Sequence, residues 1–313
     1  MLAYLKILRP VNLLIIILTM GLLRFCVIEP FFALGNATPA MDYFDFGLLL
    51  LATLLIAAGG YVVNDYYDTA IDQVNKPAKT IAGKTIPLKK IKTYYGILTM
   101  LGLLTGLWLA YRIDYFLLAL IFPVVAIMLW YYSVKYQKTY LAGNLMIALM
   151  SGLVVLIVWI AEMFALLANP VKYVEVINQV KIVGWITLAY TLFAFLVTLV
   201  REVLKDIEDM QGDSAHGYRT LPIVSGIRKA RAIAAVVAAL VILALGIFQY
   251  YLYLQGFTLV FWYLLIAVQT LLLYLIYQTL QSQTKEDFNF ASNVSKIIML
   301  AGILSMQLFY ISL

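Results

Sequence analysis

Nine long apolar stretches constrain this chain more than any other feature of its sequence. An α-helix needs ~20 residues to cross the ~30 Å hydrocarbon core of a membrane, and each stretch is about that long. The sequence therefore predicts an all-α, polytopic membrane protein with nine transmembrane helices around a central cavity. The predicted spans lie near residues 10–28, 44–63, 94–112, 115–134, 143–168, 181–200, 231–253, 258–280 and 294–313.

The composition agrees with a membrane protein. Hydrophobic residues make up 64% of the chain and charged residues only 12%, against roughly 25% charged residues in soluble domains. The polar connections are short, so we expect a single transmembrane domain over residues 1–313. Only Arg112, Ile113 and Asp114 divide two of the stretches, which predicts a tight helical hairpin over residues 94–134. The one cysteine, Cys26, permits no disulfide within the chain.

The lysines and arginines are distributed unevenly between the two sides of the predicted membrane. With nine crossings, 18 of the 22 basic residues fall on the side of the N-terminus. By the positive-inside rule, the N-terminus then lies in the cytoplasm and the C-terminus outside. The basic residues are spread among loops and form no continuous stripe, so nucleic acid is not an expected partner. Four basic residues fall on the other side: Arg24, Arg112, Lys172 and Lys181.

One pattern of three carboxylates, D-x-x-D-x-x-x-D, occurs twice at span ends that the charge count places in the cytoplasm. On an α-helix this spacing puts three side chains on one stripe. Mg²⁺ prefers oxygen ligands and commonly bridges one or two carboxylates to substrate phosphates. The pattern therefore predicts that a diphosphate is held through Mg²⁺ between two facing triplets. The first triplet is Asp65, Asp68 and Asp72, and the second triplet is Asp206, Asp209 and Asp213.

These acids have two other interpretations, a solvated helix end and a transport site. A single triplet could be a solvated helix end, but two with identical spacing on the same side of the membrane favour divalent metal. A cation or lipid transporter would instead place acids near the middle of spans. Glu162 is the remaining mid-span candidate, and its position toward the outer end of the fifth span favours an interfacial residue.

Cations beside the triplets fit diphosphate chemistry, because negative charge builds on the leaving group as its carbon to oxygen bond breaks. Tyr131 and Tyr132 precede Lys135 at helical spacing, so a phenol and an ammonium can face one cavity. A fitting reaction is transfer of an allylic isoprenoid through a carbocation, with the long tail lying between the spans. The candidate diphosphate-binding residues are Lys76, Lys79, Arg201, Lys205 and Lys135.

Together these residues resemble the UbiA-type superfamily of intramembrane prenyltransferases. The family's N-D-x-x-D-x-x-x-D appears as Asn64 followed by the first triplet, and its second aspartate motif is the second triplet. The resemblance implies a Mg²⁺ cofactor, a polyprenyl diphosphate, a lipophilic acceptor and a role for Lys135 with Tyr131 or Tyr132. Many members have R-P-x-R-P after the first motif. This chain has KPAKT there, so lysines replace the arginines and Thr80 replaces the second proline.

Within the superfamily, the stretch REVLKDIEDMQGDSAHGYRTLPI and the opening RPVN, with Arg9 and Asn12, are most similar to the geranylgeranylglycerol-phosphate geranylgeranyltransferase branch. This similarity implies transfer to the hydroxyl of a prenylglycerol phosphate, whose own phosphate could contact Arg9 or Lys84. An aromatic or quinone-precursor acceptor is the alternative. His216, the only histidine, is expected to be a solvated loop residue. No protein partner is expected, and the bilayer lipid surrounds the spans.

Overall fold

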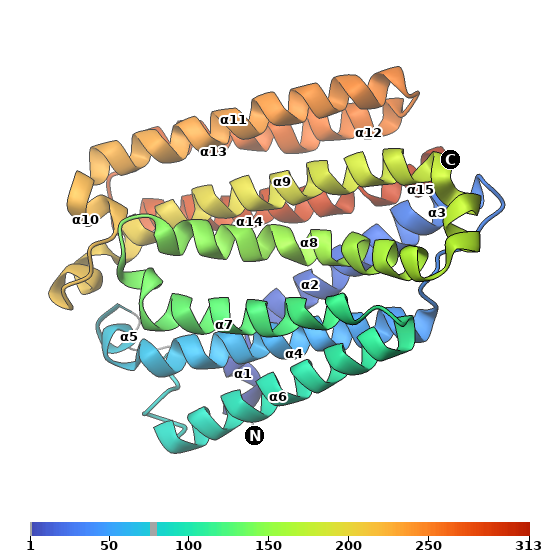
Figure 1. Ribbon diagram of the computed structural model, residues 1–313. Helices are drawn as coiled ribbons and strands as arrows, with labels where there is room; N and C mark the ends of the chain where they lie inside the picture. The colour runs from blue at the N-terminus through green and yellow to red at the C-terminus, as the bar shows by residue number, and fades with distance from the viewer. Residues whose placement is uncertain (1, 76–79) are drawn as a thin grey trace.

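The computed structural model describes residues 2–75 and 80–313 as a bundle of long helices that run side by side (Figure 1). Two elements, η1 and η4, are π-helical, and η2 and η3 are short 3-10 helices. The elements are α1 (Leu2–Ile7), α2 (Pro10–Leu23), η1 (Arg24–Ile28), α3 (Glu29–Ala33), α4 (Tyr43–Tyr67), α5 (Thr69–Asn75), α6 (Leu88–Ile113), η2 (Phe116–Leu120), α7 (Ile121–Val134), η3 (Tyr136–Lys138), α8 (Ala142–Ala168), α9 (Pro170–Ala215), α10 (Leu221–Ser225), α11 (Ile227–Leu254), α12 (Thr258–Tyr263), η4 (Leu264–Gln269), α13 (Thr270–Gln281), α14 (Lys285–Leu304) and α15 (Gln307–Ser312).

Among the described residues, nine helical segments are long and apolar enough to cross a membrane, and each overlaps one predicted span. The prediction of an all-α protein with nine spans is confirmed. The largest difference is α9, which has 46 residues and extends beyond the predicted span at both ends. The predicted hairpin is also confirmed: α6 ends at Ile113, its C-cap Asp114 adopts a left-handed backbone conformation (φ 58°), and η2 and α7 return against it.

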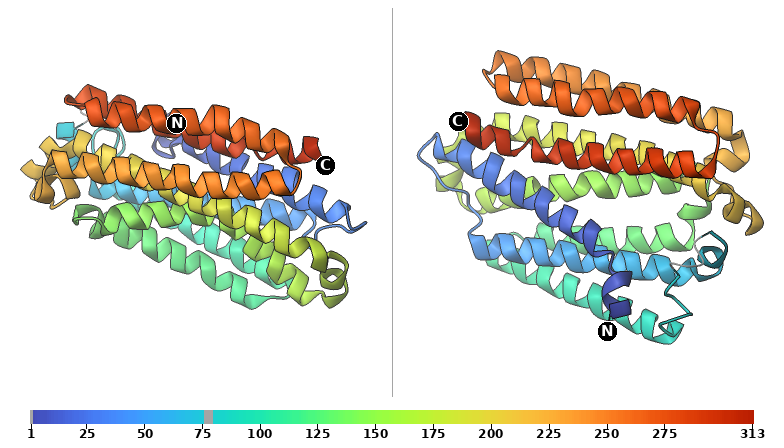
Figure 2. Two further views of the ribbon diagram at one scale, coloured as in Figure 1. Left: turned by 90° about the horizontal axis from the view of Figure 1, so that it is seen from above. Right: turned by 180° about the vertical axis from the view of Figure 1, so that it is seen from behind.

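The bundle has two distinct ends. The end that carries α5 and α10 is called the motif end, because α4 finishes there with the first triplet and α9 finishes there with the second (Figures 1 and 2). The opposite end, called the far end, carries α3, α15 and the C-terminus. Helix α5 packs against α9, so the two triplets come from elements that touch. The short helix α1 packs against α4 and, through Tyr4 on Tyr94, against α6.

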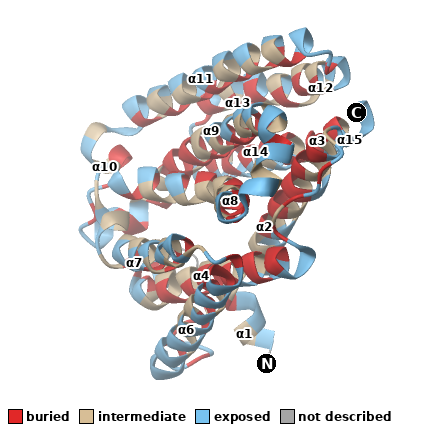
Figure 3. Cartoon of the chain, turned by 45° about the vertical axis from the view of Figure 1, so that its right-hand side comes forward, coloured by how far each residue is buried: buried red, intermediate tan, exposed pale blue. Residues whose placement is uncertain are grey.

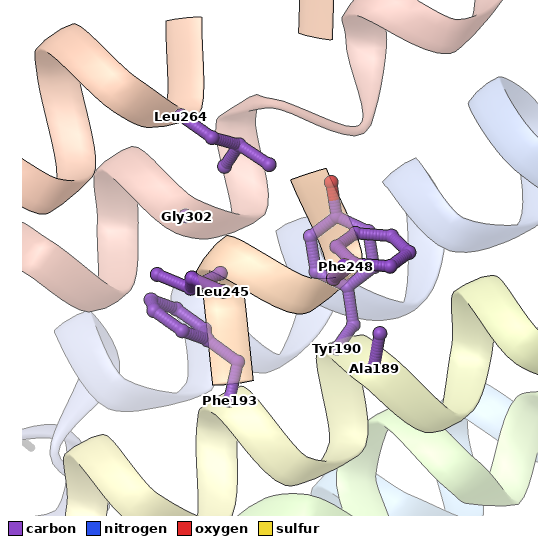
Figure 4. Close-up of a pocket in the computed structure, with 7 residues that line it drawn as sticks. All are labelled: Ala189, Tyr190, Phe193, Leu245, Phe248, Leu264 and Gly302. Carbon is purple, nitrogen blue, oxygen red and sulfur yellow. The ribbon is translucent and has the colours of Figure 1, made fainter. Parts of the chain in front are cut away.

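Buried residues lie on the inward faces of the helices (Figure 3), and most of them are apolar. One apolar cluster extends from Ile16 to Phe309. Helices approach closely where glycine replaces a side chain: a Cβ on Gly302 would lie 2.2 Å from the ring of Phe193. Beside this contact, Tyr190, Phe193 and Gly302 help to line an apolar pocket of about 10 Å³ between α9, α11, η4 and α14 (Figure 4). Such a volume holds about one water molecule at most, so this pocket cannot accept a prenyl chain as it stands.

The far end holds one buried ion pair and a second, more exposed group of charges around Arg112. Arg24 donates to Glu162 Oε2 (2.9 Å) and to the carbonyl of Met41 (2.6 Å), and both charged side chains are at most 2% exposed. The backbone N–H of Ala40 also donates to Glu162. Glu162 is therefore a fully buried partner of Arg24 rather than the interfacial residue expected from its position, because the 34–42 loop folds over it.

A second ion pair at this end joins α6 to α4. Arg112 donates through Nε to Asp45 Oδ1 (2.5 Å) and through Nη2 to Asp42 Oδ2 (3.2 Å). Asp42 is also the N-cap of α4 and accepts the N–H of Asp45 (2.7 Å). Lys172 donates to the carbonyl of Pro39 (3.3 Å). Three of the four basic residues assigned to this side of the membrane thus have a protein partner here.

Candidate active site

The first triplet does not lie on one unbroken helix. Helix α4 ends at Tyr67, Asp68 is its C-cap residue, and α5 begins at Thr69. The N–H of Asp72 still donates to the carbonyl of Asp68 (2.8 Å), so a backbone hydrogen bond is kept across the break. The single helical stripe expected from the spacing is therefore wrong for this triplet, because the helix is interrupted at its middle aspartate.

Asp68 is held by two neutral side chains. Gln137 Nε2 donates to Asp68 Oδ1 (2.6 Å), and Asn64 Nδ2 donates to Asp68 Oδ2 (2.9 Å). Asn64 also donates to Gln137 Oε1 (2.7 Å), which closes a ring of three side chains. Burial raises the pKa of Asp68 to about 6, and the hydrogen bond from Gln137 acts in the opposite direction. The ring fixes the orientation of this carboxylate without neutralising it.

Asp65 has a cationic partner. Arg9 Nη2 donates to Asp65 Oδ1 (2.6 Å) and to Asn64 Oδ1 (3.2 Å). The guanidinium lies 5.1 Å from the ring centroid of Tyr61, whose hydroxyl is hydrogen-bonded to Asn12. Arg9 is the N-cap of α2 in a left-handed conformation (φ 53°), which is uncommon for a residue other than glycine. The predicted residues Arg9, Asn12 and Asn64 therefore do gather beside the first triplet.

The second triplet lies on the continuous last turns of α9, as its spacing predicts. Asp209 and Asp213 are buried, and Asp206 is half-buried. Asn144, in the first turn of α8, donates to Asp206 Oδ2 (2.9 Å). Arg201 forms an ion pair with the neighbouring Glu202, one turn before the triplet.

Three side chains lie close to acids of both triplets. Tyr132 interacts electrostatically with Asp68 and Asp206. Lys205 does so with Asp68 and Asp209. The two triplets therefore meet at one place at the motif end.

Tyr218 is the third of these side chains. It follows the second triplet, and its N–H donates to the carbonyl of Asp213 (2.9 Å). Burial raises the pKa of its phenol, and the nearby carboxylates of Asp68, Asp213 and Asp72 raise it further. The phenol of Tyr218 is thus kept protonated and can act as a hydrogen-bond donor among the carboxylates.

Of the remaining predicted residues, some lie beside the triplets and others do not. Tyr132 is half-buried beside the triplets, whereas Tyr131 is 45% exposed and packs against Trp130. Lys135 caps α7, and its ammonium lies 5.8 Å from the ring centroid of Tyr136. Lys76 and Lys79 lie outside the described residues. Beyond them, Thr80 is buried and donates to the carbonyl of Asp72 (3.0 Å).

Sequence reasoning missed four residues that contact the site: Tyr61, Gln137, Asn144 and Tyr218. Gln137 stands in a polar connection between spans, where amide side chains are common, and Asn144 stands in the first turn of α8. The one local signal is their nearness in sequence to Lys135, a candidate site residue. Their partners, Asp68 and Asp206, are distant in sequence, so only the packing of the helices reveals these contacts.

The donor set fits a hard divalent cation. The side chains that converge offer carboxylate oxygens and no thiolate or imidazole, which suits Mg²⁺. Within residues 2–75 and 80–313, no three acidic, histidine or cysteine side chains are close enough together to hold a metal ion by themselves. Mg²⁺ commonly takes only one or two carboxylates and completes its shell with substrate phosphates and water.

A model of the UbiA prenyltransferase family matches residues 10–297. The chain belongs to the UbiA prenyltransferase family. This UbiA protein is 32% identical to a digeranylgeranylglyceryl phosphate synthase of Saccharolobus solfataricus over 84% of either chain. It is 28% identical to an enzyme of the same name from Methanosphaera stadtmanae, over 96% of this chain and 97% of the relative. It is therefore an integral membrane protein and a prenyltransferase.

A solved structure shares the fold of this UbiA chain. It is a UbiA homolog from Archaeoglobus fulgidus bound to GPP and Mg²⁺, which superposes with a TM-score of 0.58 at 16% identity, over 97% of this chain and 99% of that chain. At that identity the likeness concerns the helix arrangement. Both the family match and the fold similarity cover nearly the whole chain.

Proposed function

We propose that this UbiA protein transfers a polyprenyl group, geranylgeranyl, from its diphosphate to the hydroxyl of a prenylglycerol phosphate. The observation that carries the proposal is the meeting of two carboxylate triplets at the end of an apolar helix bundle. The names of the relatives, digeranylgeranylglyceryl phosphate synthases, support the glyceryl phosphate acceptor. Mg²⁺ and GPP in the Archaeoglobus homolog support a metal-held diphosphate.

The site residues have distinct roles in this proposal. The six aspartates of the two triplets would hold Mg²⁺, which supplies positive charge that stabilises the departing diphosphate. Lys205 and Arg201, together with Lys76 and Lys79, add positive charge to the same leaving group. Lys135 and Tyr131 would be catalytic residues, as the family resemblance implies. Tyr132, which interacts with Asp68 and Asp206, would lie beside the departing diphosphate.

Arg9, Asn64 and Asn12 form the second part of the site. Arg9 pairs with Asp65 and carries a guanidinium beside the first triplet, where the phosphate of the acceptor could bind. Guanidinium groups bind phosphate through paired N–H donors. The whole chain, residues 1–313, then acts as one prenyltransferase domain with its N-terminus and both triplets in the cytoplasm.

The acceptor decides between the two enzyme classes considered. Purified protein in detergent with Mg²⁺ and geranylgeranyl diphosphate would be offered geranylgeranylglycerol phosphate, 4-hydroxybenzoate and dihydroxynaphthoate, with products identified by mass. We expect product only with the glycerol phosphate. Product with an aromatic acceptor alone would establish the alternative class, and ion flux in liposomes without any transfer would favour the transporter.

A further inference from the structure

The connection between α7 and α8 contacts both carboxylate triplets. Gln137, on η3, donates to Asp68 of the first triplet at 2.6 Å. Asn144, at the start of α8 and only 6% exposed, donates to Asp206 of the second triplet at 2.9 Å. Because both donors come from one short stretch of chain, the two carboxylates are oriented relative to the same piece of backbone.

The backbone of this connection is itself held in place. A Cβ on Gly143 would lie 2.6 Å from the carbonyl oxygen of Tyr136, so glycine is needed for α8 to start where it does. The carbonyl of Lys138 accepts the N–H of Arg219 (2.9 Å), which lies just after the second triplet. The ammonium of Lys138 lies 5.4 Å from the ring centroid of Tyr218. The connection is thus anchored to the second triplet's loop by contacts other than Asn144.

The chemistry of the two donors matters as much as their position. An amide group donates hydrogen bonds but carries no charge, so it orients a carboxylate and leaves its negative charge intact. Each carboxylate oxygen has two lone pairs, and a single hydrogen bond leaves one for a metal ion. Partners that orient metal ligands in this way commonly contribute 10–100-fold to metal affinity, as a rough range.

We propose that Gln137 and Asn144 are positioning residues that hold Asp68 and Asp206 in the mutual orientation needed to bind one metal-diphosphate unit. Both donate to carboxylates that would ligate the metal, so they act through those carboxylates. This inference rests on the function proposed above. It assigns to the α7–α8 connection the task of setting the geometry between the two triplets.

The test uses the full-length protein in detergent and measures metal binding directly. Gln137→Met and Asn144→Leu remove each donor with little change in size. The matched controls are Gln281→Met and Asn178→Leu, at exposed positions on α13 and α9. Mn²⁺ binding in the presence of inorganic pyrophosphate is followed by the electron paramagnetic resonance signal of free Mn²⁺. Prenyl transfer is measured as a function of Mg²⁺, and thermal unfolding is recorded for each protein.

We expect the apparent Kd for Mn²⁺ and the Mg²⁺ activation constant to rise about 10–100-fold in both test variants and to stay unchanged in the controls. The rate at saturating Mg²⁺ should largely recover, which a purely structural defect would not allow. If either substitution prevents folding, Gln137→Ala and Asn144→Ala remove the same donors without adding an apolar group. Metal constants within about twofold of the parent would overturn the inference, since oriented ligands are worth more than that.

Failure of the inference and failure of the proposed function are distinguishable. A parent protein that transfers the prenyl group, with test variants that bind Mn²⁺ normally, refutes the positioning role alone. A parent that makes no prenylated product refutes the proposed function. A lower unfolding temperature with unchanged metal constants would show that the amides serve packing only, and this too refutes the positioning role.

Discussion

At the far end of the bundle the buried carboxylate of Glu162 faces the guanidinium of Arg24, whereas at the motif end the buried carboxylate of Asp68 faces the amides of Asn64 and Gln137. Both carboxylates are removed from water and both are hydrogen-bonded. The difference lies in charge, because the far-end pair is neutral overall, whereas the motif-end ring of Asn64, Asp68 and Gln137 contains no cation that cancels the carboxylate.

This difference separates stability from activity. A buried ion pair whose charges cancel has no charge left for a ligand. Removing one partner leaves the other charge buried without compensation, which lowers the stability of the fold. A carboxylate held by amides keeps its charge and gains a fixed direction, which is what a metal ligand needs. We therefore expect far-end substitutions to change stability and motif-end substitutions to change turnover.

The largest expected effect is that of Asp68→Ala at the motif end. Loss of this ligand should lower prenyl transfer by about 10³-fold or more, comparable to the removal of a key electrostatic group from other active sites. Transfer of radiolabelled geranylgeranyl groups measures it. The matched control is Asp42→Ala at the far end, which should keep normal turnover. A fully active Asp68→Ala protein would refute the metal assignment.

The next effect concerns the far end. Glu162→Leu leaves the guanidinium of Arg24 buried without a counter-charge, which should lower the free energy of unfolding by roughly 3–5 kcal/mol. Thermal or denaturant unfolding in detergent measures this loss. The folded fraction should retain the parent's turnover number.

A double variant separates charge from packing at the same place. Adding Arg24→Met to Glu162→Leu removes both charges, and replacement of both partners of a buried pair is often close to neutral in stability. Most of the lost stability should therefore return. If the double variant is as unstable as the single one, the loss comes from packing and not from an unpaired charge.

A smaller effect is expected when the motif end is given the chemistry of the far end. Gln137→Lys would place an ammonium beside Asp68 and cancel its charge. Metal affinity should fall about 10–100-fold, as for other changes in the groups that support metal ligands, while the unfolding temperature stays the same or rises. A lower stability with unchanged metal activation would show that this contact serves stability, as at the far end, and would contradict the difference drawn between the two ends.

The smallest effect is predicted for His216→Ala. His216 is exposed just after α9, and its ring Nδ1 pairs with the carbonyl of Gly212 (2.9 Å). An exposed substitution of this kind usually changes stability by less than about 0.5 kcal/mol. Turnover across neutral pH should match that of the parent, and a large loss would give this histidine a role in proton transfer.

The spans and the triplets could be predicted because both are recognised from local sequence patterns. Hydropathy over one span and a spacing of three and four residues depend only on neighbours along the chain. The break at Asp68 could not be predicted in this way, because the spacing fits an unbroken helix equally well. In the structure α4 ends there and the short helix α5 begins, whereas the second triplet lies on the unbroken helix α9.

The contacts that give each carboxylate its character are long-range. Gln137 meets Asp68, and Glu162 meets Arg24, only after the helices have packed. Two opposite charges inside separate apolar stretches, both toward the same side of the membrane, were a usable signal for the second pair. A glutamine in a polar loop offers no such signal, because loops contain many glutamines for no reason beyond solubility.

The length of α9 has a consequence for the lipid around the protein. At about 1.5 Å per residue, its 46 residues make a helix roughly twice as long as the ~30 Å hydrocarbon core. The second triplet is therefore carried on a helix that passes through the bilayer, whereas the first triplet spans the break between α4 and α5. A bilayer whose thickness does not match the apolar part of such a helix adjusts by tilt or by local thickening or thinning of the lipid, so the reaction rate should depend on acyl-chain length.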